Sequence, residues 1–322
     1  MREDNSKMLA IIEKFPMELK TPFVSAQITK KQKPNKIIIC GMGGSAIAGR
    51  VIKDILADDL NIHVVNDYIL PKIKGKPLVI VCSYSGNTQE TLSCFEQALK
   101  RKYDIVGIGS GGKLLQFCKE NNIEWVKLKP GIPPRTAFPN LFASIFHVLE
   151  LKGIVSGKKK EIEHFSKNLD LKAVKERAQV IAEGLGKNVP VIYTYDFPAV
   201  AKRIKDEFNE NAKIHSRVEL FPELNHNDVN SWLNCDMSAR SKLIILRSNE
   251  EPEQISKVIT VTEKLLHDKT EILEFQMNGK NRLEKALNTV LTFDLASVYL
   301  AEINKVDSFP VKIIEEFKEM LD

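Results

Sequence analysis

The chain of 322 residues is long enough for two α/β domains of ordinary size, and its net charge of +5 is small for that length. Its basic residues are scattered, apart from a lysine run at 158–160, and form no stripe interleaved with aromatic side chains, so nucleic-acid binding is not indicated. The sequence has no run of about 18 apolar residues and no apolar N-terminal stretch, so neither a membrane span nor a signal peptide is expected. The five cysteines form no CxxC pair, which is typical of a reducing compartment and indicates a cytoplasmic protein.

The first half of the chain alternates between short apolar runs and amphipathic segments. Residues 4–20 have apolar side chains at helical spacing and are expected to form one helix. The strands expected after it are 36–40, 61–65, 78–82, 104–108 and 124–128, and the last helix of this half is expected at 141–151. Nearly continuous apolar strands that alternate with helices indicate a parallel sheet covered on both faces.

The pattern restarts in the second half. Residues 152–188 are rich in lysine and glutamate and are expected to form surface helices and a linker. Strands are then expected at 189–193, 243–247 and 271–275, and helices at 198–210, 254–267 and 283–303. The predicted fold class is therefore α/β, with two domains, 1–152 and 153–322, each a parallel sheet between two layers of helices.

A glycine-rich loop follows the first expected strand. It reads Gly41-Met42-Gly43-Gly44-Ser45-Ala46-Ile47-Ala48-Gly49, and the glycines allow a tight turn before a helix whose first N–H groups can bind an anion. The pattern fits a dinucleotide-binding fingerprint, with Asp67 at a suitable distance for a ribose contact. It fits a sugar-phosphate pocket equally well, and a tight turn without a ligand is the third interpretation.

The loop after the third expected strand favours the sugar phosphate. It reads Ser83-Tyr84-Ser85-Gly86-Asn87-Thr88-Gln89-Glu90, so Ser83, Ser85 and Thr88 can donate from hydroxyls, and main-chain N–H groups from Gly86 onward can add theirs. A phosphate monoester needs many donors in a small volume, whereas a dinucleotide-binding domain has no use for a second donor cluster here. An ordinary helix cap by Thr88 or Asn87 would explain only one of these residues.

The segment 83–90 resembles the signature S-x-S-G-x-T-x-E of sugar isomerase (SIS) domains, which occur in isomerases and in regulators that only sense sugar phosphates. Three further segments, PPRTAFP at 133–139, NENAK at 209–213 and ELNHN at 223–227, narrow the resemblance. With them the chain resembles the bifunctional phosphoglucose/phosphomannose isomerases of archaea and some bacteria, over about residues 36–310. The resemblance implies that both α/β domains are SIS-like, with the phosphate loops in the first and the catalytic residues in the second.

Interconversion of an aldose and a ketose moves a proton between adjacent carbons through an enediol. The reaction needs a base, a second proton carrier to open the sugar ring, and a positive group near the enediolate oxygen. The resemblance assigns these roles to Glu210, His226 and Arg135, and it implies a hexose 6-phosphate substrate with no metal and no organic cofactor. Taken alone, Glu210 would be a solvated acid and His226 a capping or core histidine, so the assignment depends on their occurrence together with the phosphate loops. Glu223 is ranked below Glu210 as the base because its neighbours suggest a turn.

The resemblance also implies a set of substrate-binding residues: Gly43, Gly44, Ser45, Ser83, Ser85, Gly86, Thr88, Pro134 and Ser297. Near the C-terminus, the family carries a hydroxyl residue and then a catalytic lysine ahead of a Gly-Val-Asp turn. Here Ser297 is followed by Asn304-Lys305-Val306-Asp307, and the glycine is absent. Lys305 is therefore either the catalytic lysine or the residue that fills the glycine position, and Ser297 lies near a family threonine linked to the use of mannose 6-phosphate.

In the family, the histidine reaches the active site from a partner subunit, so the resemblance implies a homodimer with active sites completed across the interface. Two other classes of function remain open. One is a sugar-phosphate sensor without catalysis, in which Glu210 and His226 would have no use. The other is a nicotinamide-dependent oxidoreductase built on the glycine-rich loop, which titration with nicotinamide cofactors would reveal.

Overall fold

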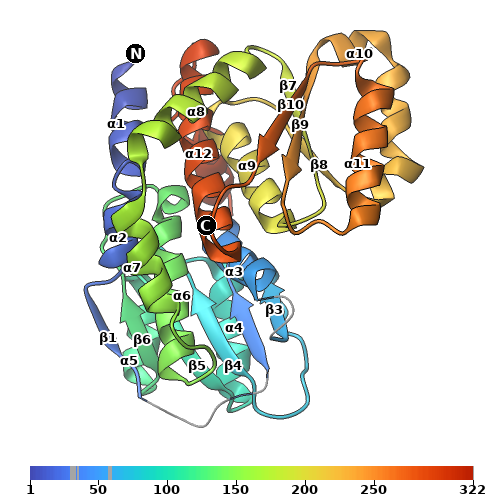
Figure 1. Ribbon diagram of the computed structural model, residues 1–322. Helices are drawn as coiled ribbons and strands as arrows, with labels where there is room; N and C mark the ends of the chain where they lie inside the picture. The colour runs from blue at the N-terminus through green and yellow to red at the C-terminus, as the bar shows by residue number, and fades with distance from the viewer. Residues whose placement is uncertain (30–33, 35, 57–59, 322) are drawn as a thin grey trace. The chain divides into compact units, whose positions relative to one another are not determined.

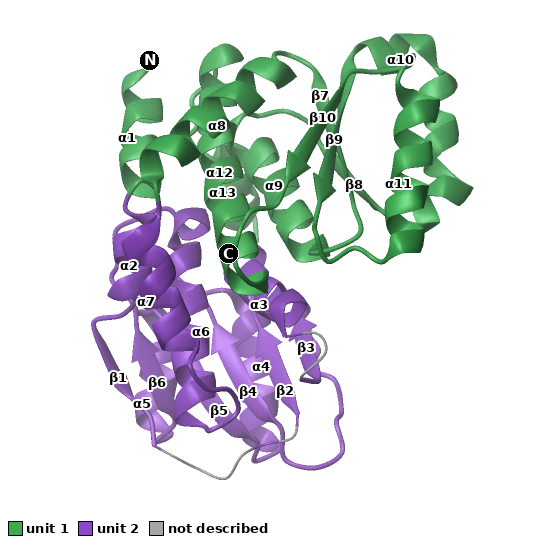
Figure 2. Ribbon diagram, viewed as in Figure 1, with its two compact units in different colours: residues 1–13, 170–322 green, residues 14–169 purple. Residues whose placement is uncertain are grey.

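The computed structural model describes residues 1–321 except 30–33, 35 and 57–59. The chain forms two compact units: unit 1 comprises residues 1–13 and 170–322, and unit 2 comprises residues 14–169 (Figure 2). The units divide after Leu169 rather than after residue 152, because helix α7 (Lys158–Asn168) packs on α2 (Phe15–Lys20) and α6 (Phe138–Leu151) of unit 2.

The single helix expected over residues 4–20 is wrong. The segment forms two helices, α1 (Glu3–Ile12) and α2 (Phe15–Lys20), which belong to different units. Pro16 lies in the first turn of α2, where its missing N–H is tolerated, but the ring would break a helix that continued through it. α1 packs on the long helix α12 of unit 1 instead.

Unit 2 is built on a six-stranded sheet with the order β1-β6-β5-β4-β2-β3. The strands are β1 (Ser25–Gln27), β2 (Ile37–Cys40), β3 (Ile62–Val65), β4 (Leu78–Cys82), β5 (Asp104–Gly109) and β6 (Glu124–Lys127). β2 to β6 are parallel, as the sequence predicted, whereas β1 pairs antiparallel with β6. The sequence did not predict β1 because its three residues are all exposed and carry no apolar pattern.

Helices cover both faces of this sheet (Figure 1). α4 (Gln89–Lys100) and α5 (Gly112–Glu120) pack on the face that carries Ile38 and Val79. α3 (Gly43–Ile55) and α6 (Phe138–Leu151) lie on the opposite face, where a Cβ on Gly49 would be 2.7 Å from the Ile39 side chain. The strands are apolar on both faces because both are covered.

A buried lysine at the end of α6 binds the first residues of strands β5 and β6. Lys152 is fully buried, and its ammonium donates to Glu124 Oε2 at 2.5 Å and to Asp104 Oδ2 at 3.2 Å. Lys152→Met is expected to lower the free energy of unfolding by about 3–5 kcal/mol, because two partly buried carboxylates lose their partner. Denaturant unfolding checks this, with Lys127→Met on the exposed side of β6 as the control, for which a change of about 0.5 kcal/mol or less is expected. Equal stability of the two variants would contradict the role of Lys152.

Unit 1 contains a parallel four-stranded sheet with the order β10-β9-β7-β8. The strands are β7 (Val189–Thr194), β8 (Arg217–Leu220), β9 (Ser241–Arg247) and β10 (Ile272–Gln276). One face of this sheet is covered by α8 (Leu171–Leu185), α9 (Pro198–Asn211) and α12 (Arg282–Ile303), and the other face is covered by α11 (Glu253–Leu266) (Figure 1). The unit also contains the short α10 (Cys235–Ala239) and the C-terminal α13 (Lys312–Glu319). β8 was not predicted, because its alternation of charged and apolar residues leaves it half-buried at the sheet edge.

α12 is the central helix of unit 1 and contacts α1, α8 and α9. By length and composition it could cross a membrane, although the sequence analysis expected no such segment. However, 83% of its most apolar window is buried in the structure, as in the core helix of a globular domain. The apolar character of α12 is therefore explained by packing within the fold.

Candidate active site

The two loops that the sequence singled out leave neighbouring strands of unit 2. β2 and β4 are adjacent, but the chain runs from β2 outward to β3 and from β4 in the other direction to β5 and β6. This reversal makes a topological switch point, and ligands of open α/β sheets bind at the carboxyl ends of strands at such points. A Cβ on Gly41 would lie 3.0 Å from the Cys82 carbonyl oxygen, so the two loops touch.

The glycine-rich loop also lies against the segment that carries Arg135. A Cβ on Gly44 would be 2.9 Å from the Pro134 carbonyl oxygen and 3.1 Å from the Arg135 Cα. The 3₁₀ helix η1 (Pro134–Ala137) therefore rests on the first turn of α3, where only glycine allows this approach. Arg135 is buried there, at the first turn of α3.

Ser45 and Tyr84 tie these loops together. The Ser45 hydroxyl oxygen accepts a hydrogen bond from the Tyr84 main-chain N–H at 3.2 Å. The Tyr84 hydroxyl donates to the Lys129 carbonyl at 2.9 Å and accepts from the Ile132 N–H at 3.2 Å. Burial raises the pKa of Tyr84, so the hydroxyl stays protonated and remains a donor. The loop that leads to η1 is thereby fixed to the end of β4.

The serine-rich loop is folded around its own hydroxyls. Ser83 is buried, and its hydroxyl donates to the Thr88 hydroxyl at 3.0 Å and accepts from the Gly86 N–H at 3.1 Å. Thr88 precedes α4, yet within the described residues its side chain does not cap that helix. The interpretation as an ordinary Thr88 cap is therefore wrong, because the Thr88 hydroxyl bonds to Ser83 and not to the first turn of α4.

Gly86 and Asn87 fix this loop to the start of α5. Gly86 has a φ of +75°, and a Cβ there would lie 1.9 Å from the Gly111 carbonyl oxygen. The Asn87 carboxamide oxygen accepts from the Lys113 N–H at 3.0 Å, and the Asn87 N–H donates to the Ser85 hydroxyl at 3.3 Å. Ser85 is exposed and Ser83 is buried, so the loop offers hydroxyls at two depths.

Unit 2 therefore brings together most of the substrate-binding residues predicted from the sequence. They are Gly43, Gly44, Ser45, Ser83, Ser85, Gly86, Thr88 and Pro134, with Arg135 beside them. Two helix N-termini, several hydroxyls and a guanidinium are suited to a phosphate group. Asp67, the candidate ribose contact, accepts a hydrogen bond from the Ile69 N–H at 3.2 Å within its own turn.

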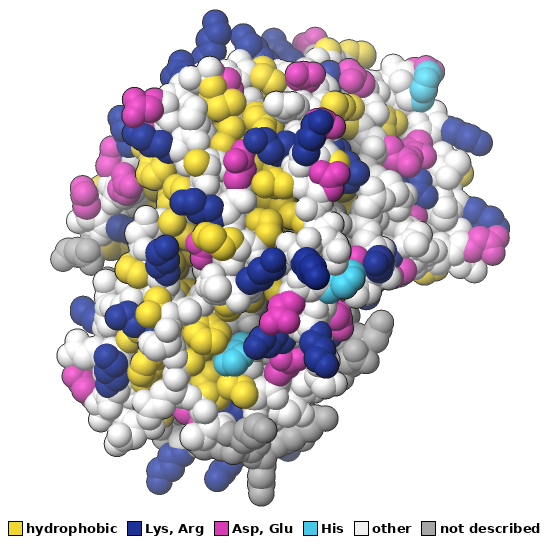
Figure 3. Space-filling model, turned by 60° about the vertical axis from the view of Figure 1, so that its left-hand side comes forward, with side chains coloured by type: hydrophobic (Ala, Val, Ile, Leu, Met, Phe, Trp, Pro, Cys, Tyr) yellow, Lys and Arg dark blue, Asp and Glu magenta, His cyan; other side chains and the backbone are white. Residues whose placement is uncertain are grey.

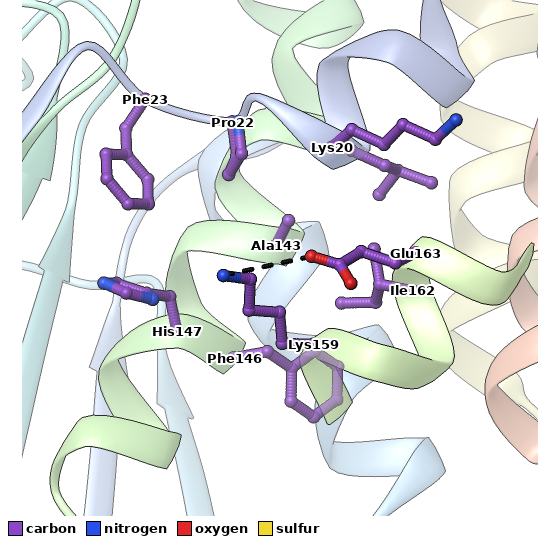
Figure 4. A pocket seen from close by; sticks show the side chains of 10 residues that line it. Lys20, Pro22, Phe23, Ala143, Phe146, His147, Lys159, Ile162 and Glu163 are labelled. Atoms are coloured by element: carbon purple, nitrogen blue, oxygen red, sulfur yellow. Dashed lines mark ion pairs between the residues drawn. The ribbon is translucent and has the colours of Figure 1, made fainter. Parts of the chain in front are cut away.

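A pocket in unit 2 away from these loops has a volume of about 110 Å³ (Figure 4). Its lining residues are Leu19, Lys20, Pro22, Phe23, Ala143, Phe146, His147, Lys159, Ile162 and Glu163. The His147 and Phe23 rings are 4.8 Å apart, and burial, with the Lys159 charge, lowers the pKa of His147. The sequence predicted none of these residues as a site residue.

Glu210 lies in unit 1, in the last turn of α9, and is half-buried. Its main-chain carbonyl accepts a hydrogen bond from the Lys213 ammonium. One and two turns earlier on the same helix are Glu207 and Arg203, both buried. Arg203 binds Asp294 of α12 through Nε–Oδ1 (2.9 Å) and Nη2–Oδ2 (2.7 Å), and its Nη1 lies 3.3 Å from Glu207 Oε1.

Arg203, Glu207 and Asp294 were not predicted from the sequence. A signal was available, since charged residues at 203, 207 and 210 share one helical face with apolar Val200 and Ile204. An arginine at the apolar boundary of a helix requires a buried counter-charge. The partner Asp294 is 91 positions away, so local spacing could not identify it.

Ser297 is fully buried between α9 and α12. Its hydroxyl donates to the Asp294 carbonyl at 2.6 Å and accepts from Asn211 Nδ2 at 2.8 Å. The same Asn211 amide donates to Glu207 Oε2 at 2.9 Å. Ser297 is therefore part of a hydrogen-bond network that joins α12 to the last turn of α9, the turn that contains Glu210. Its role in substrate binding remains a prediction.

His226 is exposed at the end of the 3₁₀ helix η2 (Glu223–His226). Asn225, just before it, donates to the Thr262 hydroxyl of α11 at 2.6 Å. Asp228, just after it, accepts hydrogen bonds from the Tyr193 hydroxyl and from Arg217. His226 thus lies on a turn that is anchored on both sides. The competing base Glu223 is exposed and accepts from Asn227 at 3.2 Å.

Lys305 follows the end of α12 with a φ of +58°, in the left-handed region that favours glycine. The Lys305 N–H donates to the Glu302 carbonyl at 3.1 Å, and the Val306 N–H donates to the Ala301 carbonyl at 3.0 Å. This pair of bonds is a Schellman cap, in which glycine usually takes the position of Lys305. The backbone therefore favours the alternative in which Lys305 fills the missing glycine position.

The fold and the loops define a protein with sugar isomerase (SIS) domains. Among the described residues, no group of three or more His, Cys, Asp or Glu side chains is arranged to hold a metal ion. Residues 174–321 match the family model described as the bacterial phospho-glucose isomerase C-terminal SIS domain. The chain belongs to the family of the bifunctional phosphoglucose/phosphomannose isomerases, which confirms the resemblance seen in its motifs.

The comparisons span almost the whole chain. The bifunctional phosphoglucose/phosphomannose isomerase of Aquifex aeolicus (strain VF5) is 32% identical over 303 residues, which cover 91% of this chain and 93% of that protein. The corresponding protein of Thermoplasma volcanium is 32% identical over 292 residues, 90% of this chain and 92% of that protein. The C-terminal domain of glucosamine-fructose-6-phosphate aminotransferase from Francisella tularensis has a TM-score of 0.70 at 15% identity, over 94% of this chain and 98% of that chain, and shares the fold.

Proposed function

We propose that this protein is an aldose–ketose isomerase that interconverts glucose 6-phosphate, and also mannose 6-phosphate, with fructose 6-phosphate. The observation that carries the proposal is the pair of loops, rich in hydrogen-bond donors, at the topological switch point of unit 2. The relatives of this chain are named bifunctional phosphoglucose/phosphomannose isomerases. The loops account for binding of the phosphate group that these three sugars share. The catalytic residues account for the difference between a sensor and an enzyme.

The phosphate is proposed to bind at the first turns of α3 and α4. Gly43 and Gly44 let it approach the main-chain N–H groups, Ser85 and Thr88 donate to it from their hydroxyls, and Ser83 orients the Thr88 hydroxyl by donating to it. The phosphate carries up to two negative charges near neutral pH, and the positive ends of the two helices favour both. Binding energy from this non-reacting group then positions the sugar carbons for proton transfer.

The proposed chemistry is a proton transfer without a change of overall oxidation state. His226 assists opening of the sugar ring, and Glu210 takes the proton from C2 of the open-chain aldose. The resulting enediolate is stabilised by the Arg135 guanidinium. The hydroxyl proton on the C2 oxygen passes to the C1 oxygen, and the protonated Glu210 returns its proton to C1, so that C1 becomes a CH₂OH group and C2 becomes the ketose carbonyl.

The proposal includes a cytoplasmic homodimer whose active sites are completed across the subunit interface. On the face drawn in Figure 3, basic and acidic side chains are interspersed, and no continuous basic stripe covers that face of the described residues. A small-molecule substrate is consistent with this distribution. Sedimentation at assay concentration tests the dimer, because a fully active monomer would contradict it.

A coupled assay tests the function. Purified protein is incubated separately with glucose 6-phosphate and mannose 6-phosphate, and the formation of fructose 6-phosphate is followed. Turnover of both sugars supports the proposal. Turnover of only one of the two sugars would keep the isomerase activity and limit it to that sugar. Binding of sugar phosphates without turnover would contradict the enzyme and support the sensor.

A further inference from the structure

A buried ionic cluster of unit 1 begins one helical turn before Glu210 on α9. It consists of Arg203, Glu207 and Asp294 and is named the Arg203 cluster below. We infer that the Arg203 cluster positions the Glu210 carboxylate and sets the pH range in which it acts as a base. This inference rests on the proposed function, in which Glu210 accepts the proton. The three residues are positioning residues, since they act through Glu210.

The geometry fixes the last turn of α9 from two sides. Arg203, Glu207 and Glu210 follow one another at helical spacing and share one face of the helix. Two parallel hydrogen bonds hold the Arg203 guanidinium to Asp294, which gives it a single orientation. On the other side, Asn211 links Glu207 to Ser297 of α12. The residue before Asn211 is Glu210, so both anchors act on the turn that carries the base.

The charge of the cluster is not balanced. One guanidinium faces two carboxylates, Asp294 and Glu207, within salt-bridge distance. Burial of the Arg203 guanidinium opposes its charge, but Asp294, Glu207 and, more weakly, Glu210 raise its pKa overall. An interaction between two charges is mutual, so the Arg203 cation also favours the ionised form of Glu210. Each buried carboxylate that shares the cation opposes that effect.

Two of the described charged groups outside α9 lie near its last turn. On α12 the facing charged group is Asp294, and after α9 the ammonium of Lys213 lies on the Glu210 carbonyl. β7 and β8 turn the Ile192 and Val218 side chains toward α9. The charged residues of β8, Arg217 and Glu219, alternate with Val218 and so point to the opposite face of the sheet.

The test replaces Glu207 by glutamine and records kcat/KM against pH with glucose 6-phosphate. When Glu207 loses its negative charge, the attraction between the Arg203 cation and the Glu210 carboxylate is less opposed. The pKa of Glu210 is therefore expected to fall. The acidic limb of the profile, where Glu210 becomes protonated, is then expected to move down by about half a pH unit or more. The substrate phosphate titrates identically in every variant, so the difference between the profiles belongs to the enzyme.

Two further variants make the test specific. Asp206→Asn removes the same charge one position away, where Asp206 pairs with Lys202 at 2.8 Å on the partly exposed side of α9, and it is expected to leave the limb in place. Glu207→Asp keeps the charge and should restore the wild-type midpoint. The midpoint does not depend on the concentration of folded enzyme, so a moderate loss of stability leaves the result valid. If Glu207→Gln does not fold, Asp294→Asn removes the second carboxylate and is expected to move the limb in the same direction.

Unchanged limbs in Glu207→Gln and Asp294→Asn would overturn the inference. An equal shift in Asp206→Asn would overturn it too, because net charge alone would then explain the result. Glu210→Gln, measured in parallel, separates the two proposals. If that variant is inactive, the base is correctly assigned whatever the cluster does. If it is fully active, the assignment of the base in the proposed function fails.

Discussion

Glu210→Gln is expected to lower kcat for isomerisation by about 10³-fold while KM changes less than about threefold. Glutamine keeps the size of the side chain and its place in the last turn of α9, but it cannot accept a proton from C2 of the sugar. The phosphate loops are untouched, so substrate binding is preserved. Steady-state assays with saturating glucose 6-phosphate measure the loss, and circular dichroism checks that the variant is folded.

Glu223→Gln is the matched control for this prediction. Glu223 is exposed, begins the short helix that ends in His226, and was the competing candidate for the base. Its replacement is expected to leave kcat within about twofold of the wild type, as for an exposed residue without contact to the reacting atoms. The opposite result, an active Glu210→Gln and an inactive Glu223→Gln, would transfer the role of the base to Glu223.

Gly86→Ala is expected to lower the free energy of unfolding by about 3 kcal/mol and to abolish saturable sugar-phosphate binding at ordinary assay concentrations. The new Cβ would lie 1.9 Å from the Gly111 carbonyl oxygen, and the backbone has a φ of +75°. The serine-rich loop must move to relieve the contact. Movement separates the Gly86 N–H from the Ser83 hydroxyl and disrupts the donors at the start of α4. Denaturant unfolding and ligand titration measure the two effects.

Gly153→Ala separates backbone strain from steric contact. Gly153 has a similar φ of +70°, but a Cβ there would meet open space among the described residues. It is expected to lose only about 1 kcal/mol, from the left-handed backbone alone, and to bind sugar phosphate normally. If both variants lost the same stability and the same affinity, the close packing of the serine-rich loop on α5 would have no functional importance.

Apart from β8, the parallel strands of both units were predictable because each is a short, mostly apolar run. β1 and β8 were not, since edge strands with exposed or alternating side chains carry only a weak pattern. Pro16 marks the division between α1 and α2, but the prediction used only the helical spacing of the apolar residues.

The phosphate loops were predictable for a different reason. Glycines and hydroxyl residues at strand ends have few other uses, and their chemistry is visible in the sequence. The Arg203 cluster was not predictable, because Asp294 meets Arg203 only when α9 packs on α12. For Lys305, only the observed φ of +58° favours one of the two alternatives that the sequence left open.

The most direct test of the enediol isomerisation is nuclear magnetic resonance of wild-type protein with fructose 6-phosphate in D₂O. We predict that glucose 6-phosphate and mannose 6-phosphate form and that both carry deuterium at C2, because Glu210 exchanges its proton with solvent before returning it. Recovery of unchanged fructose 6-phosphate, or formation of an epimer at another carbon, would contradict the proposed activity.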